Sequence, residues 1–292
     1  MDYSRIITRL SRPVNHKEVE SHLQSILAKS GENKTAEVYQ RCFSCLDLTS
    51  LNPSDSAKSI AEFARKTSEF NRHFPHITNV ATLCVYPSFV DVAGIALGDS
   101  EVGITSVGAG FPASQTYPEV KVLECAMAEE NGADEIDIVL NLGLYLDENY
   151  EAAANEVEMI CRELGTDTLL KVILETGVLP TLEDVRRAAV LAMAGGADMI
   201  KTSTGKQGGG ATPEAFLVMC EAVRDYFNDS GKRVGLKAAG GVREAEDAVV
   251  YYTIVEEVLG EEWLTPEYFR IGASALANDL LSKIEGKPIS YF

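Results

Sequence analysis

The sequence predicts a closed (β/α)8 barrel, a TIM barrel, with extra N-terminal helices. Short and nearly continuous apolar runs recur along the chain, as expected of strands buried on both faces of a parallel sheet. Stretches with helical periodicity separate them, and repeated strand-then-helix units imply right-handed crossovers. The length of 292 residues suits one barrel of about 250 residues with an extension. We count eight such units, which favours a closed barrel over an open doubly wound sheet.

The expected strands are the apolar runs themselves. They cover residues 44–48, 80–86, 103–107, 134–140, 169–174, 198–202, 234–238 and 268–271.

Three intervening helices have clear boundaries. One is expected over residues 117–131, with Val120, Leu123 and Met127 on one face and Gly132 as its stop. A second begins at Thr181–Asp184, a candidate capping box, and ends at Gly195–Gly196; a third begins at Thr212, followed by Pro213.

Residues 1–40 are expected to form a helical extension, and residues 41–292 a single barrel domain. Asn15 is placed to cap a helix in which Val19, Leu23, Ile26 and Leu27 share a face. Such a helix packs on the barrel or, alternatively, binds a partner.

Charge and composition exclude several classes of protein. The chain has 26 basic and 44 acidic residues, a net charge of −18, which repels nucleic acid and anionic membranes. We find no secretory signal and no apolar run of about 18 residues. Six cysteines without an export signal indicate reduced thiols and a cytoplasmic protein.

Several apparent motifs are incomplete. Residues 108–113 match G-x-G-x-x-A, but Pro112 and the lack of a later acidic partner argue for a turn rather than a dinucleotide site. Cys42 and Cys45 could form a zinc site with His73 and His76, but the gap between the two pairs is longer than in a zinc finger and the two histidines are too close together in sequence. All four histidines precede the third expected strand, so a Ser-His-Asp triad or a multi-histidine metal site is not expected.

Three charged residues interrupt the expected strands toward the carboxyl ends, where the functional side chains of a barrel gather: Asp137, Lys201 and Lys237. A structural role is the alternative, in which a Lys–Asp ion pair fills the barrel interior. Such a pair uses only one of the two lysines and leaves the other without a structural role. A lysine nucleophile must be neutral, and lowering its pKa from ~10.4 to ~7 requires about 4.6 kcal/mol. A second ammonium ~6 Å away supplies about 2.8 kcal/mol at an effective dielectric of ~20, and desolvation can supply the rest. The pair therefore predicts an amine that condenses with a carbonyl to an imine.

Glycines and cations follow the last three strands, where barrels commonly bind phosphate. These loops could be ordinary turns, but their convergence favours a phosphate site. Its candidate residues are Gly205, Lys206, Gly240, Gly241, Arg243, Gly272 and Ser274.

From about Cys45 to Leu281 the chain closely resembles the deoxyribose-phosphate aldolases. The segments are residues 46–51 (LDLTSL), 134–137 (DEID), 170–177 (LKVILETG), 199–206 (MIKTSTGK), 235–243 (GLKAAGGVR) and 270–274 (RIGAS). The resemblance implies reversible cleavage of 2-deoxy-D-ribose 5-phosphate to D-glyceraldehyde 3-phosphate and acetaldehyde in deoxynucleoside breakdown. It implies no metal or organic cofactor, and often a homodimer.

The resemblance also implies roles for individual residues. Lys201 would form the Schiff base, Lys237 would lower its pKa, and Asp137 would donate and accept protons, while Asp47 and Thr49 would lie near the sugar hydroxyls. The loop residues above match the phosphate-binding positions.

The chain departs from the family at two places and matches it at a third. Ala275 stands where many relatives have a second serine, and Phe292 follows Tyr291 where relatives often end in a tyrosine that reaches the site. Cys84 matches an aldehyde-reactive cysteine of some relatives, although we interpret it as buried packing.

Two other functions stay open. The chain could be another lysine-dependent aldolase acting on a different phosphorylated sugar, or a catalytically silent barrel that binds sugar phosphates. The complete set of Asp137, Lys201 and Lys237 argues against the second.

Overall fold

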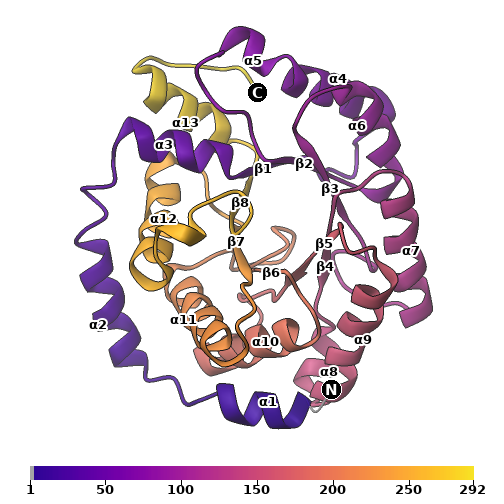
Figure 1. The fold of residues 1–292 in the computed structure, drawn as a ribbon, viewed down its shortest axis with the longest axis vertical. Coiled ribbons are helices and arrows are strands. Elements are labelled where there is room, and N and C mark those ends of the chain that lie inside the picture. Colours follow the sequence, from indigo (N-terminus) through magenta and orange to yellow (C-terminus); the bar gives the residue numbers. More distant parts are fainter. Residues whose placement is uncertain (1–2) are drawn as a thin grey trace.

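Eight parallel strands close into a barrel in the computed structural model, which describes residues 3–292 (Figure 1). Each strand pairs with its neighbours in sequence, and β1 pairs with β8 to complete the ring. The predicted TIM barrel is therefore confirmed. The strands are β1 (Leu46–Thr49), β2 (Thr82–Val85), β3 (Gly103–Val107), β4 (Glu135–Val139), β5 (Leu169–Ile173), β6 (Met199–Lys201), β7 (Gly235–Ala239) and β8 (Phe269–Ala273).

Helices follow the strands and surround the barrel (Figure 1). Their buried apolar residues pack against the outer face of the barrel. They are α4 (Ala57–Ser68), α5 (Phe70–His73), α6 (Val90–Leu97), α7 (Pro118–Glu130), α8 (Leu142–Leu146), α9 (Tyr150–Glu163), α10 (Leu182–Ala194), α11 (Pro213–Ser230), α12 (Ala245–Leu259) and α13 (Leu276–Glu285), with short 3-10 turns η1 (Pro87–Phe89) and η2 (Glu261–Trp263).

The predicted starts of α11 and α10 are both present, but the capping contact of α10 differs from the predicted one. Thr212 accepts a hydrogen bond from Ala215 N at 3.2 Å, with Pro213 in the first turn of α11, as predicted. Thr181 caps α10 through Asp184 N at 3.1 Å. The Asp184 carboxylate accepts from the Thr181 hydroxyl at 2.7 Å, so its contact differs from that of a capping box.

Helix α7 has the predicted span, but its apolar stripe faces outward. Val120, Leu123 and Met127 are 48%, 60% and 52% exposed. The buried positions are instead Lys121, Cys125 and Ala128. Lys121 occupies this face because its ammonium binds Glu156 at 2.6 Å and Ser114 at 2.8 Å. The core-facing side of α7 is therefore partly ionic, and its large apolar side chains are left on the surface.

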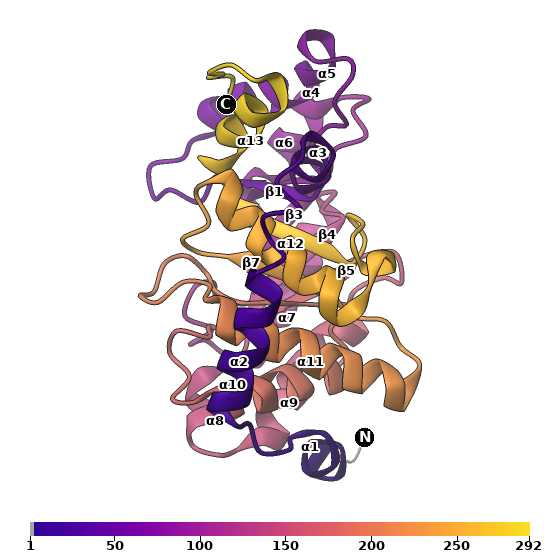
Figure 2. The same cartoon turned by 90° about the vertical axis from the view of Figure 1, so that its left-hand side faces the viewer.

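The N-terminal extension lies along the outside of the barrel (Figure 2). Helix α1 (Tyr3–Leu10) contacts α9, α10 and α11, and α2 (His16–Leu27) contacts α11 and α12. Asn15 caps α2 through Lys17 N at 3.1 Å, as predicted. The expected domain boundary after residue 40 falls inside α3 (Ala36–Ser44), which packs on α13.

The residues of the incomplete motifs can be placed in the fold. Residues 108–113 form turns, and α7 begins only at Pro118. Residues 3–292 contain no cluster of three or more potential metal-ligating side chains. Within the same residues, none of the helices has the length and apolarity needed to cross a bilayer.

Candidate active site

A cavity of about 410 Å³ opens at the carboxyl ends of the strands. In parallel barrels this end gathers the βα loops and the functional side chains. Nine of the predicted site residues line it: Thr49, Lys201, Gly205, Lys206, Gly240, Gly241, Arg243, Gly272 and Ser274. Ala275, Thr204, Phe63 and residues 50–52 also contribute to the wall.

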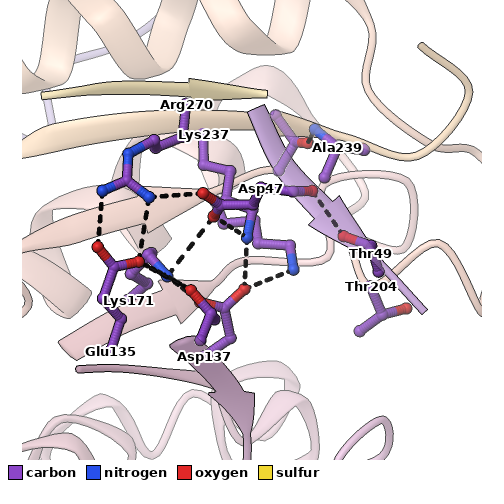
Figure 3. A network of polar contacts seen from close by, with 12 residues as sticks. Asp47, Thr49, Glu135, Asp137, Lys171, Thr204, Lys237, Ala239 and Arg270 are labelled. Carbon is purple, nitrogen blue, oxygen red and sulfur yellow. Dashed lines mark hydrogen bonds and ion pairs between the residues drawn. The ribbon is translucent and has the colours of Figure 1, made fainter. Parts of the chain in front are cut away.

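An ionic cluster fills the barrel interior beneath the cavity (Figure 3). Asp137 on β4 lies at its centre: its Oδ2 is 2.7 Å from Lys201 Nζ and 2.9 Å from Lys237 Nζ, and its Oδ1 is 2.7 Å from Lys171 Nζ. The register explains this proximity, since Lys201 and Lys237 are partners on β6 and β7 and Asp137 is the partner of Lys171 on β5. The structure thus brings Asp137, Lys201 and Lys237 together.

The other half of the cluster holds Lys237 in place. Asp47 Oδ2 is 2.5 Å from Lys237 Nζ, and Asp47 Oδ1 is 2.5 Å from Arg270. Arg270 also binds Glu135 at 2.6 Å, and Glu135 lies 2.7 Å from Lys171. Gly272 allows Lys237 to pass, because a Cβ there would lie 2.9 Å from Lys237 Cε.

The cluster contains one more basic group than acidic groups. Its four bases are Lys171, Lys201, Lys237 and Arg270, and its three acids are Asp47, Glu135 and Asp137. An uncompensated charge is costly in a buried site. Deprotonation of one lysine leaves three cations and three anions.

Lys201 is the lysine whose surroundings favour the neutral form. Burial lowers its pKa, Asp137 opposes that shift, and Lys237 lowers the pKa further. Burial also disfavours the charged form of Lys237, but Asp137 and Asp47 raise its pKa well above the usual lysine value. Despite burial, the three lysines hold the pKa of Asp137 well below that of an ordinary carboxyl. Burial thus lowers the pKa of Lys201 more than the Lys237 ammonium does. The sequence-based expectation gave the larger share of this shift to the second ammonium.

The outer end of the cavity is suited to an anion. Helix α13 begins just after Ser274 and Ala275, and its first turn has no side-chain cap. Free backbone N–H groups and the helix dipole favour negative charge there. Arg243 lines this end, and the Lys206 ammonium crosses the mouth of the cavity to contact the Leu51 carbonyl oxygen. Both cations thus lie on the wall of the cavity.

Asp47 lies below the cavity rather than on its wall. It is completely buried, and its carboxylate binds Lys237 and Arg270. Thr49 does line the cavity, and its hydroxyl donates to the Asp47 carbonyl at 2.8 Å.

Sequence reasoning did not predict three members of this cluster, which are Lys171, Glu135 and Arg270. Each interrupts a buried strand, as Asp137 does, and Glu135 is two residues before Asp137, on the same side of β4. Because side chains alternate along a strand, this spacing could have identified Glu135 as a neighbour of Asp137 from the sequence alone. The pairing of Arg270 with residues of two other strands depends on barrel closure.

The structure also places two residues that the family comparison singled out, Cys84 and Tyr291. Cys84 is fully buried on β2 and packs with Leu51 and Val107, and burial raises the pKa of its thiol. Tyr291 packs away from the cavity, with its ring 5.7 Å from that of Phe70 and its hydroxyl donating to Lys66 O at 2.7 Å. The terminal tyrosine does not reach the site in this conformation.

Comparison with known proteins identifies the family. The sequence profile of the DeoC/LacD family aldolases matches residues 45–274. The chain belongs to the DeoC/LacD family of aldolases. It is 38% identical to the deoxyribose-phosphate aldolase of Homo sapiens over 284 residues, which cover 93% of this chain and 89% of the human protein. The corresponding bovine (Bos taurus) enzyme is 39% identical over 255 residues, with 84% and 80% coverage.

Solved structures agree with this assignment. An aldolase called QR15 is 30% identical, with a TM-score of 0.66 and coverage of 83% of this chain and 96% of its own. The tetrameric deoxyribose phosphate aldolase of Aeropyrum pernix is 25% identical, with a TM-score of 0.66 and coverage of 92% and 98%. The ionic cluster and the cavity above it therefore belong to an aldolase of this family.

Proposed function

We propose that the protein is a class I aldolase that reversibly cleaves 2-deoxy-D-ribose 5-phosphate to D-glyceraldehyde 3-phosphate and acetaldehyde, in deoxynucleoside catabolism. Family membership and the names of its relatives support the reaction. The observation that most directly supports the mechanism is the surplus base in the buried cluster, where Lys201 and Lys237 share one oxygen of Asp137.

Lys201 is the nucleophile. Of the three lysines in the ionic cluster, it alone lines the cavity, and its pKa is lowered. Lys237 stays charged between Asp47 and Asp137, and as a neighbouring cation it disfavours protonation of Lys201. The nucleophile is thus uncharged without losing its hydrogen bond to Asp137.

The reaction begins when the Lys201 amine adds to the C1 aldehyde of the sugar. Loss of water from the carbinolamine gives an iminium ion. The C3 hydroxyl then loses its proton, the C2–C3 bond breaks, and its electron pair forms the enamine while C3 becomes the aldehyde of glyceraldehyde 3-phosphate. Protonation at C2 and addition of water release acetaldehyde and regenerate the amine. Asp137 is placed to accept and return the protons at Lys201, directly or through water.

The loops after β6, β7 and β8 hold the substrate phosphate. Lys206 and Arg243 supply positive charge, and backbone N–H groups near Gly240, Gly241, Gly272 and Ser274 supply donors. Binding energy from the phosphate fixes C1 near Lys201. Asp47 supports this site indirectly, by holding Lys237.

The test combines substrate choice with covalent trapping. We expect cleavage of 2-deoxyribose 5-phosphate but not of ribose 5-phosphate, because the pocket near Lys201 has to admit only acetaldehyde as the donor. Borohydride reduction in the presence of acetaldehyde should leave an adduct on the Lys201 peptide, absent in Lys201→Ala. Preference for ribose 5-phosphate would support the alternative aldolase, binding without any adduct would support a silent sugar-phosphate barrel, and an adduct on Lys237 would reverse the assigned roles.

We further propose that the protein works as a homodimer in the cytoplasm. The exposed apolar stripe of α7 supports self-association, because monomers rarely expose such contiguous apolar surface. The Aeropyrum pernix neighbour is an oligomer. All six cysteines are unpaired, which suits a reducing compartment.

A further inference from the structure

Glu175, in the loop after β5, is a buried carboxylate outside the ionic cluster. Its side chain is 1% exposed, and its backbone adopts a φ of +53°, in the left-handed region that non-glycine residues seldom occupy. Its carboxylate takes its hydrogen bonds from uncharged groups of one residue, Thr204. Burial of a carboxylate and an unusual backbone conformation are both costly, and such costs concentrate at functional positions.

The contacts of Glu175 fix a turn in the wall of the cavity. Thr204 N donates to both carboxylate oxygens at 3.2 and 3.3 Å, and the Thr204 hydroxyl donates to Oε2 at 2.5 Å. The same hydroxyl accepts from Lys206 N at 3.0 Å. Glu175 thus orders the backbone from Thr204 to Lys206, three residues that line the cavity.

The loop after β5 also packs closely against the rest of the loop after β6. Thr176 N donates to Thr202 O at 2.8 Å. A Cβ on Gly177 would lie 2.7 Å from Gly208 O, so the two backbones are in direct contact there. The first loop therefore serves as a rigid support for the second.

We propose that Glu175 is a positioning residue, which acts through Thr204 to hold the Gly205–Lys206 segment in the conformation that binds the substrate phosphate. This inference rests on the proposed function, since it assigns the phosphate to that segment. Glu175 does not line the cavity, so its effect on substrate is indirect. The negative charge of its carboxylate strengthens the hydrogen bonds from both the N–H and the hydroxyl of Thr204.

The test measures kcat/KM for 2-deoxyribose 5-phosphate and for unphosphorylated 2-deoxyribose, and takes the ratio of the two. In Glu175→Gln this ratio should fall about tenfold, the effect of weakening one charge-assisted hydrogen bond, mainly through a higher KM for the phosphorylated sugar. Thr204→Val should give the same fall, whereas Thr204→Ser, which keeps the hydroxyl, should restore most of the ratio. The double variant Glu175→Gln/Thr204→Val should be no worse than either single variant, because both remove the same contact.

Glu156→Gln is the matched control. Glu156 is also largely buried, but it binds Lys121 and Asn141 on the outside of the barrel. Its loss should lower stability without changing the ratio. An unchanged ratio in Glu175→Gln, additive losses in the double variant, or an equal loss for both sugars would overturn the inference. In each of those cases wild-type activity still stands, whereas a wild type that cleaved neither sugar would overturn the proposed function and this inference with it.

Discussion

Lys201 and Lys237 have the same side chain and share the same carboxylate oxygen, yet their surroundings push their pKa values in opposite directions. Lys237 has a second carboxylate, Asp47, at 2.5 Å, whereas Lys201 reaches only Asp137. This difference supports the proposed roles, a charged Lys237 and a free amine on Lys201.

Replacing Lys237 tests that difference. In Lys237→Leu we expect the pH profile of any residual activity to move to higher pH, because Lys201 loses a neighbouring cation that lowers its pKa. Lys237→Arg keeps the charge and should move the profile less. The measurement is the initial cleavage rate as a function of pH, and an unshifted profile in Lys237→Leu would remove the electrostatic account.

Ala275 offers a second test at the scale of one residue. It is exposed in the cavity wall, just before α13, where a serine would place a hydroxyl beside the bound phosphate. Ala275→Ser should lower KM for 2-deoxyribose 5-phosphate about threefold to tenfold, the effect of one added hydrogen bond, with little change in kcat. Steady-state kinetics with unphosphorylated 2-deoxyribose provide the control. An equal gain for that sugar would contradict a phosphate contact.

At the scale of elements, strand identity followed directly from apolar patterning, but the orientation of α7 did not. Its stripe of Val120, Leu123 and Met127 has the period of a core-facing surface. The structure instead buries Lys121, since Glu156 on α9 and Ser114 supply partners that only tertiary contact can bring together. A helical period alone does not distinguish an apolar face that packs on the barrel from one that is left exposed.

One buried arginine contributes to the attachment of the N-terminal helices. Arg186 on α10 is 2% exposed, donates to Leu10 O at 2.9 Å and contacts the Asp225 carboxylate. Arg186→Ala should lower the free energy of unfolding by about 2–3 kcal/mol, because it leaves buried polar groups without a partner. Urea denaturation measures this loss.

Arg9→Ala is the control for that experiment. The pair between Arg9 and Asp229 is solvent-exposed, so its loss should cost less than about 1 kcal/mol. Equal and small losses for the two variants would mean that the Arg186 contacts do not anchor the extension.

At the scale of the whole molecule, ring closure creates the part of the site that no local pattern specifies. Asp137, Lys201 and Lys237 stand out in the sequence because each interrupts an apolar strand. Arg270 is already beside Lys237 through the β7–β8 pairing, but Asp47 reaches Lys237 and Arg270 only when β8 pairs with β1. The sequence therefore indicates the proposed reacting groups, whereas the balance of charge around them requires the closed barrel.

The exposed apolar stripe of α7 predicts that the whole molecule self-associates. Leu123→Glu places a charge in the middle of the exposed stripe of α7 and should convert a dimer into a monomer, measured by light scattering after size-exclusion chromatography. Met159→Glu, at a comparably exposed position on α9, should leave the dimer intact. A wild type that runs as a monomer, or a dimer that survives Leu123→Glu, would show that this stripe is not the interface.

The central claim is that Lys201 is the uncharged lysine of a buried cluster in which the remaining charges balance. It is tested most directly by the pH dependence of the rate at which borohydride-type reductants trap acetaldehyde on the wild-type enzyme, with the modified peptide identified by mass spectrometry. A lowered pKa means that the neutral amine increases with pH and reaches half of its maximum below the ordinary lysine value of ~10.4. The account predicts that midpoint, with the adduct on Lys201. A midpoint at or above the ordinary value, or an adduct on Lys237, would contradict it.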